Sequence, residues 1–199
     1  ALGAHLARWL AREHAARLLL VGRREAGPDQ VRLLDELRQL GGQGWYVSAD
    51  LTQPRHAARV ITQARGQLGE VDGLFHLAGS TGDDAMGPKR DGLLALEPLD
   101  AKLTVLFSSI SAVIPGLDRG IEPYARANAW LDSWAMEQHG KGRRCVSVAW
   151  PPWEGTGMAG SWAQAFRERG LEPIAPGVAM AALEWALGSG EPWVVVLKR

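Results

Sequence analysis

The residues best suited to catalysis in this sequence are a tyrosine and an asparagine that share one helical face. Tyr124 and Asn128 lie four residues apart in the segment YARAN, inside a predicted helix, so both side chains project from the same side. A tyrosine at the start of a helix is more often a packing residue. Here Ser108 and Ser109 end the apolar strand before this helix, and that combination makes Tyr124 a catalytic candidate.

A second group of residues directly follows the strands of a predicted parallel sheet. Ligands of doubly wound sheets bind beyond the carboxyl ends of the strands, so we expect the residues at these ends to form one rim. The rim residues are Gly22-Arg23-Arg24, Asp50-Leu51, Ala78-Gly79, Ser108-Ser109 and Pro151-Pro152.

Arg23 and Arg24 indicate which nucleotide this rim would hold. They follow the strand that meets the adenosine ribose in a dinucleotide-binding fold. An acidic residue there would accept a hydrogen bond from the ribose of NAD, whereas paired guanidinium groups would hold the 2′-phosphate of NADPH. Two arginines after a strand are often only solvated surface charge. Asp50 and Ala78-Gly79 at the next strand ends suit the lining of a nucleotide site, which supports a ligand-binding role for the two arginines. The arginines then favour NADPH.

Alternating helices and short apolar strands must position these residues. Strands are predicted over residues 17–21, 45–48, 71–77, 103–109, 145–150 and 193–197. Helices are predicted over residues 2–13, 31–40, 54–68, 87–97, 124–138, 162–169 and 178–187, with Thr52 as an N-cap of the third. This order predicts an α/β fold with a Rossmann-like, doubly wound parallel sheet and helices on both faces. Residues 1–199 are expected to form a single domain.

Composition excludes several classes of partner. The chain has 22 Lys plus Arg and 22 Asp plus Glu among its 199 residues, so no overall charge attracts nucleic acid or an anionic membrane. The longest apolar runs are far shorter than the ~20 residues of a membrane helix, and no secretion signal is visible. The five histidines lack metal-ligand spacing, and Cys145 lies alone in an apolar strand. We therefore expect a cytoplasmic protein without a metal.

Eight segments of the chain resemble the ketoreductase domains of modular polyketide synthases, which belong to the short-chain dehydrogenase/reductase superfamily. They are ALGAHLARWL, LLLVGRR, SADLT, VDGLFHLAG, PKRDG, LFSSIS, YARANAWLDS and VAWPPWEGTGMA, and they follow the chain almost from end to end. The most specific feature is the lysine of PKxDG followed by LFSS and YxxxNxxLD.

This resemblance implies a β-ketoacyl thioester as substrate and a role for each polar residue. Tyr124 would protonate the ketone oxygen, and Ser109 would hydrogen-bond to that oxygen. Lys89 would lower the tyrosine pKa and hold the nicotinamide ribose, while Asn128 would orient a water that relays protons. NADPH would supply the hydride. Ser111 stays an alternative to Ser109, because the spacing to Tyr124 is longer than expected for the family.

The chain departs from the family pattern at the nucleotide loop. Of the motif G-x-G-x-x-G only the last glycine has a counterpart, Gly3, and the first strand has none. Most of a helix before PKxDG also has no counterpart at Met86-Gly87. The prediction is thus one ketoreductase-like domain over residues 1–199 that lacks its first strand and glycine-rich loop, and such a chain is expected to bind NADPH weakly.

Two smaller similarities concern the configuration of the alcohol product and a turn that would lie over the nicotinamide. Asp83-Asp84 is similar to the LDD signature of ketoreductases that form the D-configured alcohol, although a solvated turn explains it nearly as well. Trp150 and Trp153 flank a turn similar to the family's WGxW, with Pro151 in place of glycine. That turn would cover the nicotinamide, and proline would stiffen it.

Together these features predict NADPH-dependent reduction of a β-ketoacyl thioester on an acyl carrier protein, beside neighbouring synthase domains. A redox-inactive structural or epimerising module of the same fold is one alternative. A free-standing short-chain carbonyl reductase is another. The complete set of Lys89, Ser109, Tyr124 and Asn128 favours an enzyme, whereas the missing glycine loop favours the inactive module.

Overall fold

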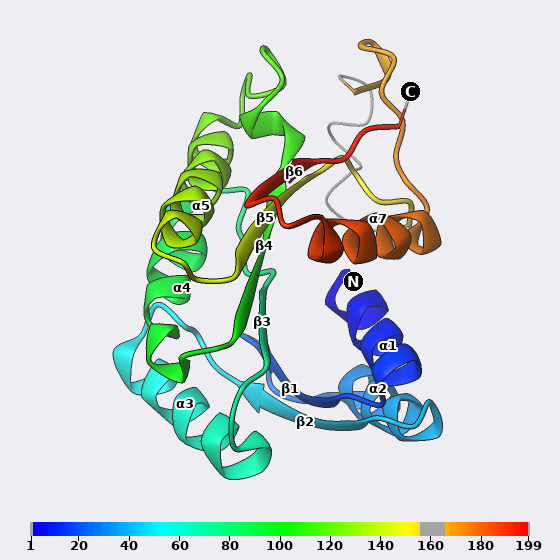
Figure 1. Cartoon of the computed structure of the whole chain (residues 1–199), viewed down its shortest axis with the longest axis vertical. Helices are drawn as coiled ribbons and strands as arrows, with labels where there is room; N and C mark the ends of the chain where they lie inside the picture. The colour runs from blue at the N-terminus through cyan, green and yellow to red at the C-terminus, as the bar shows by residue number, and fades with distance from the viewer. Residues whose placement is uncertain (1, 156–165, 199) are drawn as a thin grey trace. The chain divides into compact units, whose positions relative to one another are not determined.

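The computed structural model describes residues 2–155 and 166–198, and helices and strands alternate along the chain as the sequence predicts (Figure 1). Contacts divide the chain into two compact units. One comprises Ala1–Asp72 and Asp91–Ala101, and the other comprises Gly73–Arg90 and Lys102–Arg199. A single domain that lacks its first strand and glycine-rich loop stays a prediction.

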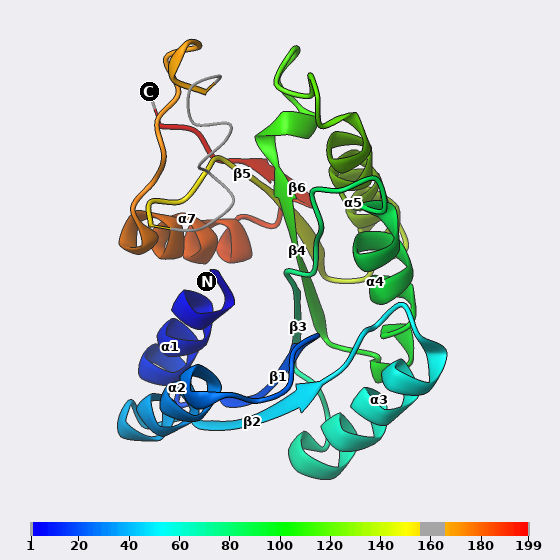
Figure 2. The ribbon, with the colours of Figure 1, turned by 180° about the vertical axis from the view of Figure 1, so that it is seen from behind.

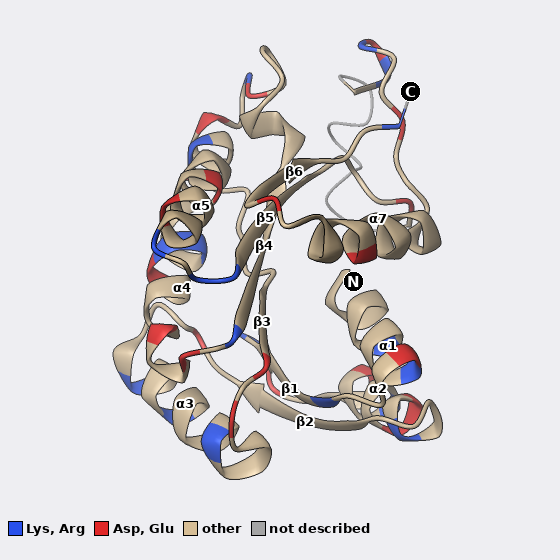
Figure 3. Cartoon of the chain, in the orientation of Figure 1, with Lys and Arg blue, Asp and Glu red and all other residues tan. Residues whose placement is uncertain are grey.

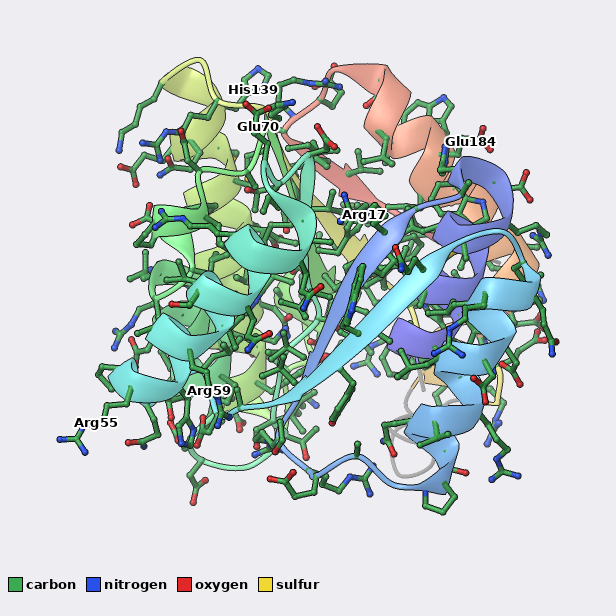
Figure 4. All side chains as sticks on the ribbon, turned by 90° about the horizontal axis from the view of Figure 1, so that it is seen from below. Arg17, Arg55, Arg59, Glu70, His139 and Glu184 are labelled. Atoms are coloured by element: carbon green, nitrogen blue, oxygen red, sulfur yellow. The ribbon has the colours of Figure 1, made fainter. Side chains whose placement is uncertain are left out.

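The first unit is built on two parallel strands. Its elements are α1 (Leu2–His14), β1 (Arg17–Gly22), α2 (Pro28–Gln39), β2 (Gln43–Ser48), α3 (Pro54–Leu68), α4 (Gly92–Leu94) and a 3-10 turn, η2 (Glu97–Leu99). Helix α3 lies on one side of the strand pair, and α1 and α2 lie on the other (Figure 4). Ala7, Ala11 and Leu37 form the core between α1, α2 and the strands.

Two arginines labelled in Figure 4 tie the strands of this unit to α3. The guanidinium of Arg17 on β1 lies 5.8 Å from the ring centroid of Trp45 and donates to the carbonyl of Gln67 in α3. From α3, Arg59 donates to the carbonyl of Ser48, the last residue of β2. The Arg17 contacts hold the amino end of β1, and the Arg59 contact holds the carboxyl end of β2, just before the expected cofactor-binding residue Asp50.

The second unit is built on four parallel strands in the order β3-β4-β5-β6. Its elements are β3 (Gly73–His76), a π-helical turn η1 (Gly87–Asp91), β4 (Leu103–Ser109), a 3-10 turn η3 (Ile110–Ala112), α5 (Glu122–Gly140), β5 (Cys145–Trp150), α7 (Pro176–Ser189) and β6 (Trp193–Val195). Helix α5 covers one face of the sheet and α7 the other (Figure 2).

Burial on both faces explains the composition of these strands. No residue of β3, β4, β5 or β6 is a lysine, arginine, aspartate or glutamate, and the strands are accordingly uncoloured in Figure 3. All six residues of β5 are buried, as expected for a parallel strand covered from both sides. Burial raises the pKa of Cys145, the first residue of β5, to about 12. The α/β class with parallel, Rossmann-like strands is confirmed.

Some sequence predictions need correction. Thr52 does not cap α3: the N-cap is Gln53, and the Thr52 hydroxyl donates instead to Oδ1 of Asp50 at 2.8 Å. The helix predicted over residues 87–97 is split into η1, α4 and η2. The first half of the helix predicted over residues 162–169 lies outside the described residues. Within the described part of the chain, no helix is long and apolar enough to cross a membrane.

Candidate active site

Ser109 and Tyr124 meet where β4 ends and α5 begins. Tyr124 lies in the first turn of α5 and is 7% exposed, and Ser109 is the last residue of β4 and is 8% exposed. The two side chains hydrogen-bond to each other. The Oγ atom of Ser109 also accepts hydrogen bonds from the backbone N (3.2 Å) and the Oγ (3.0 Å) of Ser111. With its acceptor positions used in this way, the Ser109 hydroxyl can donate its own proton.

Ser111 therefore supports Ser109 in this arrangement. Of the two serines, the hydroxyl that hydrogen-bonds to Tyr124 is that of Ser109. Ser108, on the opposite face, points to α5 and donates to the carbonyl of Asn128 at 3.3 Å.

Lys89 brings a buried positive charge to the tyrosine. Its Nζ lies 5.6 Å from the centroid of the Tyr124 ring and donates to the carbonyl of Phe107 at 3.0 Å. The side chain is buried, and burial lowers the pKa of Lys89 to about 8, while the negative charge of Asp132 acts in the opposite direction. Burial also raises the pKa of Tyr124, so the lowering expected from Lys89 does not dominate.

His76 holds the turn that carries Lys89. Its Nε2 lies 3.1 Å from the carbonyl oxygen of Pro88 and 3.0 Å from that of Lys89. Burial is the main cause that lowers the pKa of His76 to about 4, so the ring is neutral near pH 7. A neutral ring with Nε2 protonated donates to both carbonyls. His76 thus holds the backbone of the turn that carries Lys89.

Asn128 lies one helical turn after Tyr124. Its Nδ2 donates to the carbonyl of Tyr124 at 2.8 Å, and this bond sets the orientation of the amide. Its Oδ1 is buried and has no hydrogen-bond partner among residues 2–155 and 166–198. Because an unpaired buried carbonyl is costly, Oδ1 is suited to accept a hydrogen bond from a bound water or ligand. This fits the expected water-orienting role.

The first unit carries five of the expected cofactor-binding residues. Gly3 is exposed in the first turn of α1, and Leu51 lies in the turn after Asp50. The Asp50 carboxylate accepts hydrogen bonds from the backbone N and hydroxyl of Thr52, and these bonds hold the pKa of Asp50 below its usual value.

Arg23 and Arg24 follow β1 with exposed side chains, and β2 holds their backbone. Tyr46 Oη donates to the carbonyl of Arg24 at 2.7 Å, and Ser48 Oγ donates to that of Arg23 at 3.3 Å. Neither guanidinium has a salt bridge within the described part of the chain. Two exposed guanidinium groups on a fixed backbone fit a phosphate ligand.

Ala78 and Gly79, in the second unit, follow β3 beside Lys89. A methyl group on Gly79 would lie 3.4 Å from Cε and 3.6 Å from Nζ of Lys89, so the Gly79 backbone borders the ammonium group. This fits a lysine that holds a ribose at the end of the sheet.

Pro151 is buried at the end of β5, next to an aromatic cluster. The ring centroids of Trp150 and Trp153 are 5.2 Å apart, and Phe107 lies 5.6 Å and 6.4 Å from them. The Phe107 carbonyl is the one that binds Lys89, so this apolar cluster flanks the catalytic candidates.

The structure thus brings Ser109, Tyr124, Lys89 and Asn128 together within the second unit. Asp83 and Asp84 are exposed, and Asp84 Oδ1 accepts from the backbone N of Gly87 at 3.3 Å, as in a capped turn. Their link to a D-configured product stays a prediction. In the described ranges no group of three histidine, cysteine or acidic side chains could hold a metal ion.

Sequence analysis gave no role to Asp132. Asp132 is a buried carboxylate on α5 whose Oδ1 accepts a hydrogen bond from Ser147 at 2.6 Å. The aspartate of the motif YxxxNxxLD was the signal that could have identified it, because an acidic residue at position i+8 from Tyr124 shares its helical face.

A serine at the end of a parallel strand, hydrogen-bonded to a tyrosine in the first turn of the next helix and with a buried lysine beside it, is an arrangement of the short-chain dehydrogenase/reductase class. Within this class the chain belongs to the ketoreductase family, because the family model described as "KR domain" matches residues 1–155.

Two curated relatives are components of polyketide synthases. The pikromycin polyketide synthase component PikAIII of Streptomyces venezuelae is 35% identical over 216 residues, covering 98% of this chain and 14% of that protein. Erythronolide synthase EryA3 of Saccharopolyspora erythraea is 34% identical over 209 residues, covering 98% of this chain and 6% of that protein. The chain therefore corresponds to a small part of each relative.

Solved ketoreductase structures share the fold. The ketoreductase from the first module of phoslactomycin biosynthesis in Streptomyces sp. HK803 is 34% identical with a TM-score of 0.88, covering 98% of this chain and 50% of that one. The first ketoreductase of the tylosin polyketide synthase is 30% identical with a TM-score of 0.86, covering 100% of this chain and 46% of that one.

Proposed function

We propose that this chain reduces a β-ketoacyl thioester, carried on an acyl carrier protein, to the β-hydroxyacyl thioester, with NADPH as reductant. The observation that carries this proposal is the buried contact of Ser109 and Tyr124 beside the ammonium group of Lys89. The proposed setting is a cytoplasmic polyketide synthase, whose neighbouring domains would deliver the acyl carrier protein. Its support is the family to which the chain belongs and the synthase components it resembles.

The serine and the tyrosine act on the ketone oxygen in this proposal. Ser109 donates a hydrogen bond to that oxygen, which polarises the carbonyl, and Tyr124 transfers its phenolic proton to it. A bound NADPH supplies the hydride that adds to the carbonyl carbon. The ketone thereby gains one hydride and one proton and becomes the alcohol, while Tyr124 is left as a phenolate.

Lys89 stabilises the charge that forms on Tyr124 in this step, and Asn128 helps to return the proton. The positive charge of Lys89 over the Tyr124 ring stabilises the phenolate once the proton has left. The unpaired Oδ1 of Asn128 holds the water from which Tyr124 recovers its proton. Proton donation by Tyr124 thus depends on both neighbours.

A nicotinamide nucleotide is the cofactor of this class of reductase, and the finer choice of NADPH rests on Arg23 and Arg24. Their exposed guanidinium groups are able to form charge-assisted hydrogen bonds with a 2′-phosphate. NADH has a 2′-hydroxyl at that position and offers these groups no anion. The ribose at the nicotinamide end is proposed to contact Lys89, beside Gly79.

Tyr124→Phe tests this function, because it retains the ring and removes only the hydroxyl. Reduction of a β-ketoacyl thioester analogue, followed by NADPH absorbance, should fall by about 10²–10⁴-fold. NADPH affinity, measured by fluorescence titration, should be unchanged. Ser133→Ala is the matched control, since it removes an exposed hydroxyl from the same helix, one bonded only to the carbonyl of Ala129, and should reduce at the parent rate.

A variant with the parent rate would show that Tyr124 is a packing residue. A parent protein that binds NADPH but reduces no β-ketoacyl thioester would instead favour the redox-inactive module of the same fold.

A further inference from the structure

We propose that the buried carboxylate of Asp132 is a positioning residue of this reductase, which anchors helix α5 to the sheet and balances the buried charge of Lys89. The inference rests on the proposed function, because it assigns Asp132 to the support of Tyr124 and Lys89. Asp132 itself touches neither substrate nor cofactor in this assignment.

Asp132 continues the polar face of α5 that begins with the catalytic candidates. It lies four residues after Asn128 and eight after Tyr124, so all three side chains project from one side of the helix. Asp132 is only 6% exposed. A buried carboxylate is costly unless it is paired and hydrogen-bonded, so its partners show what it stabilises.

The partners of Asp132 come from three neighbouring strands. Ser147 on β5, which is fully buried, donates to Oδ1 at 2.6 Å, the short distance of a charge-assisted hydrogen bond. Ser108 on β4 and the Trp193 indole at the start of β6 also hydrogen-bond to the carboxylate. Ser147 pairs directly with Trp193 across the sheet. One side chain thus joins α5 to β4, β5 and β6.

The same network reaches the backbone of the proposed catalytic residues. The single hydroxyl proton of Ser108 is shared between the carboxylate of Asp132 and the carbonyl of Asn128, which lies 3.3 Å from Oγ. Asn128 in turn donates to the carbonyl of Tyr124 at 2.8 Å. Asp132 therefore fixes the position of α5 along its axis, and its rotation about that axis, at the turn that carries Asn128.

Lys89 supplies the second argument, because its charge needs a counter-charge. The Lys89 ammonium is buried, and within the described ranges it donates a hydrogen bond to the carbonyl of Phe107. The titratable groups that face it are His76 from β3 and Tyr124 and Asp132 from α5. His76 and Tyr124 are uncharged near pH 7 because burial lowers the pKa of the one and raises that of the other. Burial raises the pKa of Asp132 as well, but the hydrogen bonds from Ser147 and Ser108 and the charge of Lys89 oppose that rise and favour the carboxylate. The negative charge of Asp132 in turn favours protonated Lys89.

Asp132→Asn removes the negative charge of the side chain and retains its size and shape. The amide keeps an oxygen that can accept from Ser147, so the fold should survive, but protonated Lys89 loses its counter-charge. The alkaline limb of the kcat profile should move to lower pH. The ratio of variant to parent kcat should be about tenfold lower at pH 8.5 than at pH 6.5. Glu137→Gln, which removes an exposed negative charge from the same helix, is the control and should keep the parent profile.

A direct titration makes the test independent of activity. The chain has four lysines, so protein labelled with 13C at lysine gives few Cε signals, and the Lys89 signal is the one lost in Lys89→Arg. Its titration midpoint should fall in Asp132→Asn and stay at the parent value in Glu137→Gln. An unchanged midpoint overturns the proposal. If the parent protein reduces no substrate, the proposed function fails, and the midpoint alone decides the role of Asp132.

Ser147→Ala covers the case in which Asp132→Asn does not fold. It removes the closest hydrogen bond to the carboxylate and leaves the charge in place. We expect a kcat several-fold below the parent at every pH, with unchanged NADPH affinity, because the anchor of α5 is loosened. A parent kcat in this variant would overturn the anchoring role.

Discussion

His76 should make the stability of the chain depend on pH in a defined window. The side chain is 3% exposed, and its Nε2 faces the carbonyl oxygens of Pro88 and Lys89, which are acceptors. Burial and the nearby Lys89 charge disfavour a second proton, and together they lower the pKa of His76 to about 4. The change that exposes this effect is His76→Gln, which removes the titrating group.

The sign and size follow from the difference between folded and unfolded states. An unfolded histidine titrates near its ordinary pKa of about 6.5. Between pH 6.5 and 4 His76 is therefore protonated in the unfolded chain and neutral in the folded chain. Stability from His76 is therefore complete above pH 6.5 and is lost as the pH falls toward 4. A shift of about 2.5 pKa units corresponds to roughly 3 kcal/mol.

Urea unfolding followed by tryptophan fluorescence measures this contribution. The free energies of unfolding of the parent and the variant are compared at pH 7.5 and at pH 4.5. The difference between the two proteins at each pH cancels the titration of the carboxylates, because both proteins contain them. The penalty of His76→Gln should be about 2–3 kcal/mol smaller at pH 4.5 than at pH 7.5. Leu106→Ala, at the residue that pairs with His76 on β4, should carry the same penalty at both pH values. An equal His76→Gln penalty at both would refute the reasoning.

Two further changes test the cofactor and substrate sides of the site. Replacing Arg23 and Arg24 together with alanine should raise the Kd for NADPH about 10–100-fold and leave that for NADH unchanged, because each charge-assisted bond contributes roughly 1.5–3 kcal/mol before solvent screening. Equal losses, measured by fluorescence titration, would show that the arginines do not bind the 2′-phosphate. Ser109→Ala should lower kcat by about 10²-fold, whereas Ser111→Ala should cost less, since Ser111 acts through Ser109. A larger loss from Ser111→Ala would reverse the two roles.

Local patterns in the sequence were sufficient for the regular elements. The strand over residues 103–109, the strand over 145–150 and the helix over 54–68 have the predicted bounds, because continuous apolar runs and helical periodicity are local signals. The stretch from 87 to 97 differs. It contains Pro88 and two glycines, and the partners of its first turn, His76 and Asp84, hold carbonyl and amide groups there, so no regular helix forms.

The residues of the candidate site also differ in how far local sequence patterns predict them. Tyr124 and Asn128 could be paired from their spacing on one helix, and Ser109 from its place at a strand end. The motif YxxxNxxLD places Asp132 on the helical face of Tyr124, but the partners of Asp132 and His76 could not be predicted, because they lie on other elements: Ser147 is 15 residues from Asp132, and Lys89 is 13 residues from His76. Burial turns these two side chains from surface polar groups into internal ones, and burial depends on the assembled sheet.

The buried thiol of Cys145 can report, through its rate of alkylation, how often the sheet of the second unit opens. Cys145 is the one cysteine of the chain, is 4% exposed, and has a pKa of about 12, so at neutral pH it is both shielded and almost fully protonated. A thiol reagent should therefore react only after β5 separates from its neighbours, because the thiolate is the nucleophile. The rate of single-site alkylation then measures how often the centre of the sheet opens, without any engineered label, and binding of a cofactor or substrate should slow it.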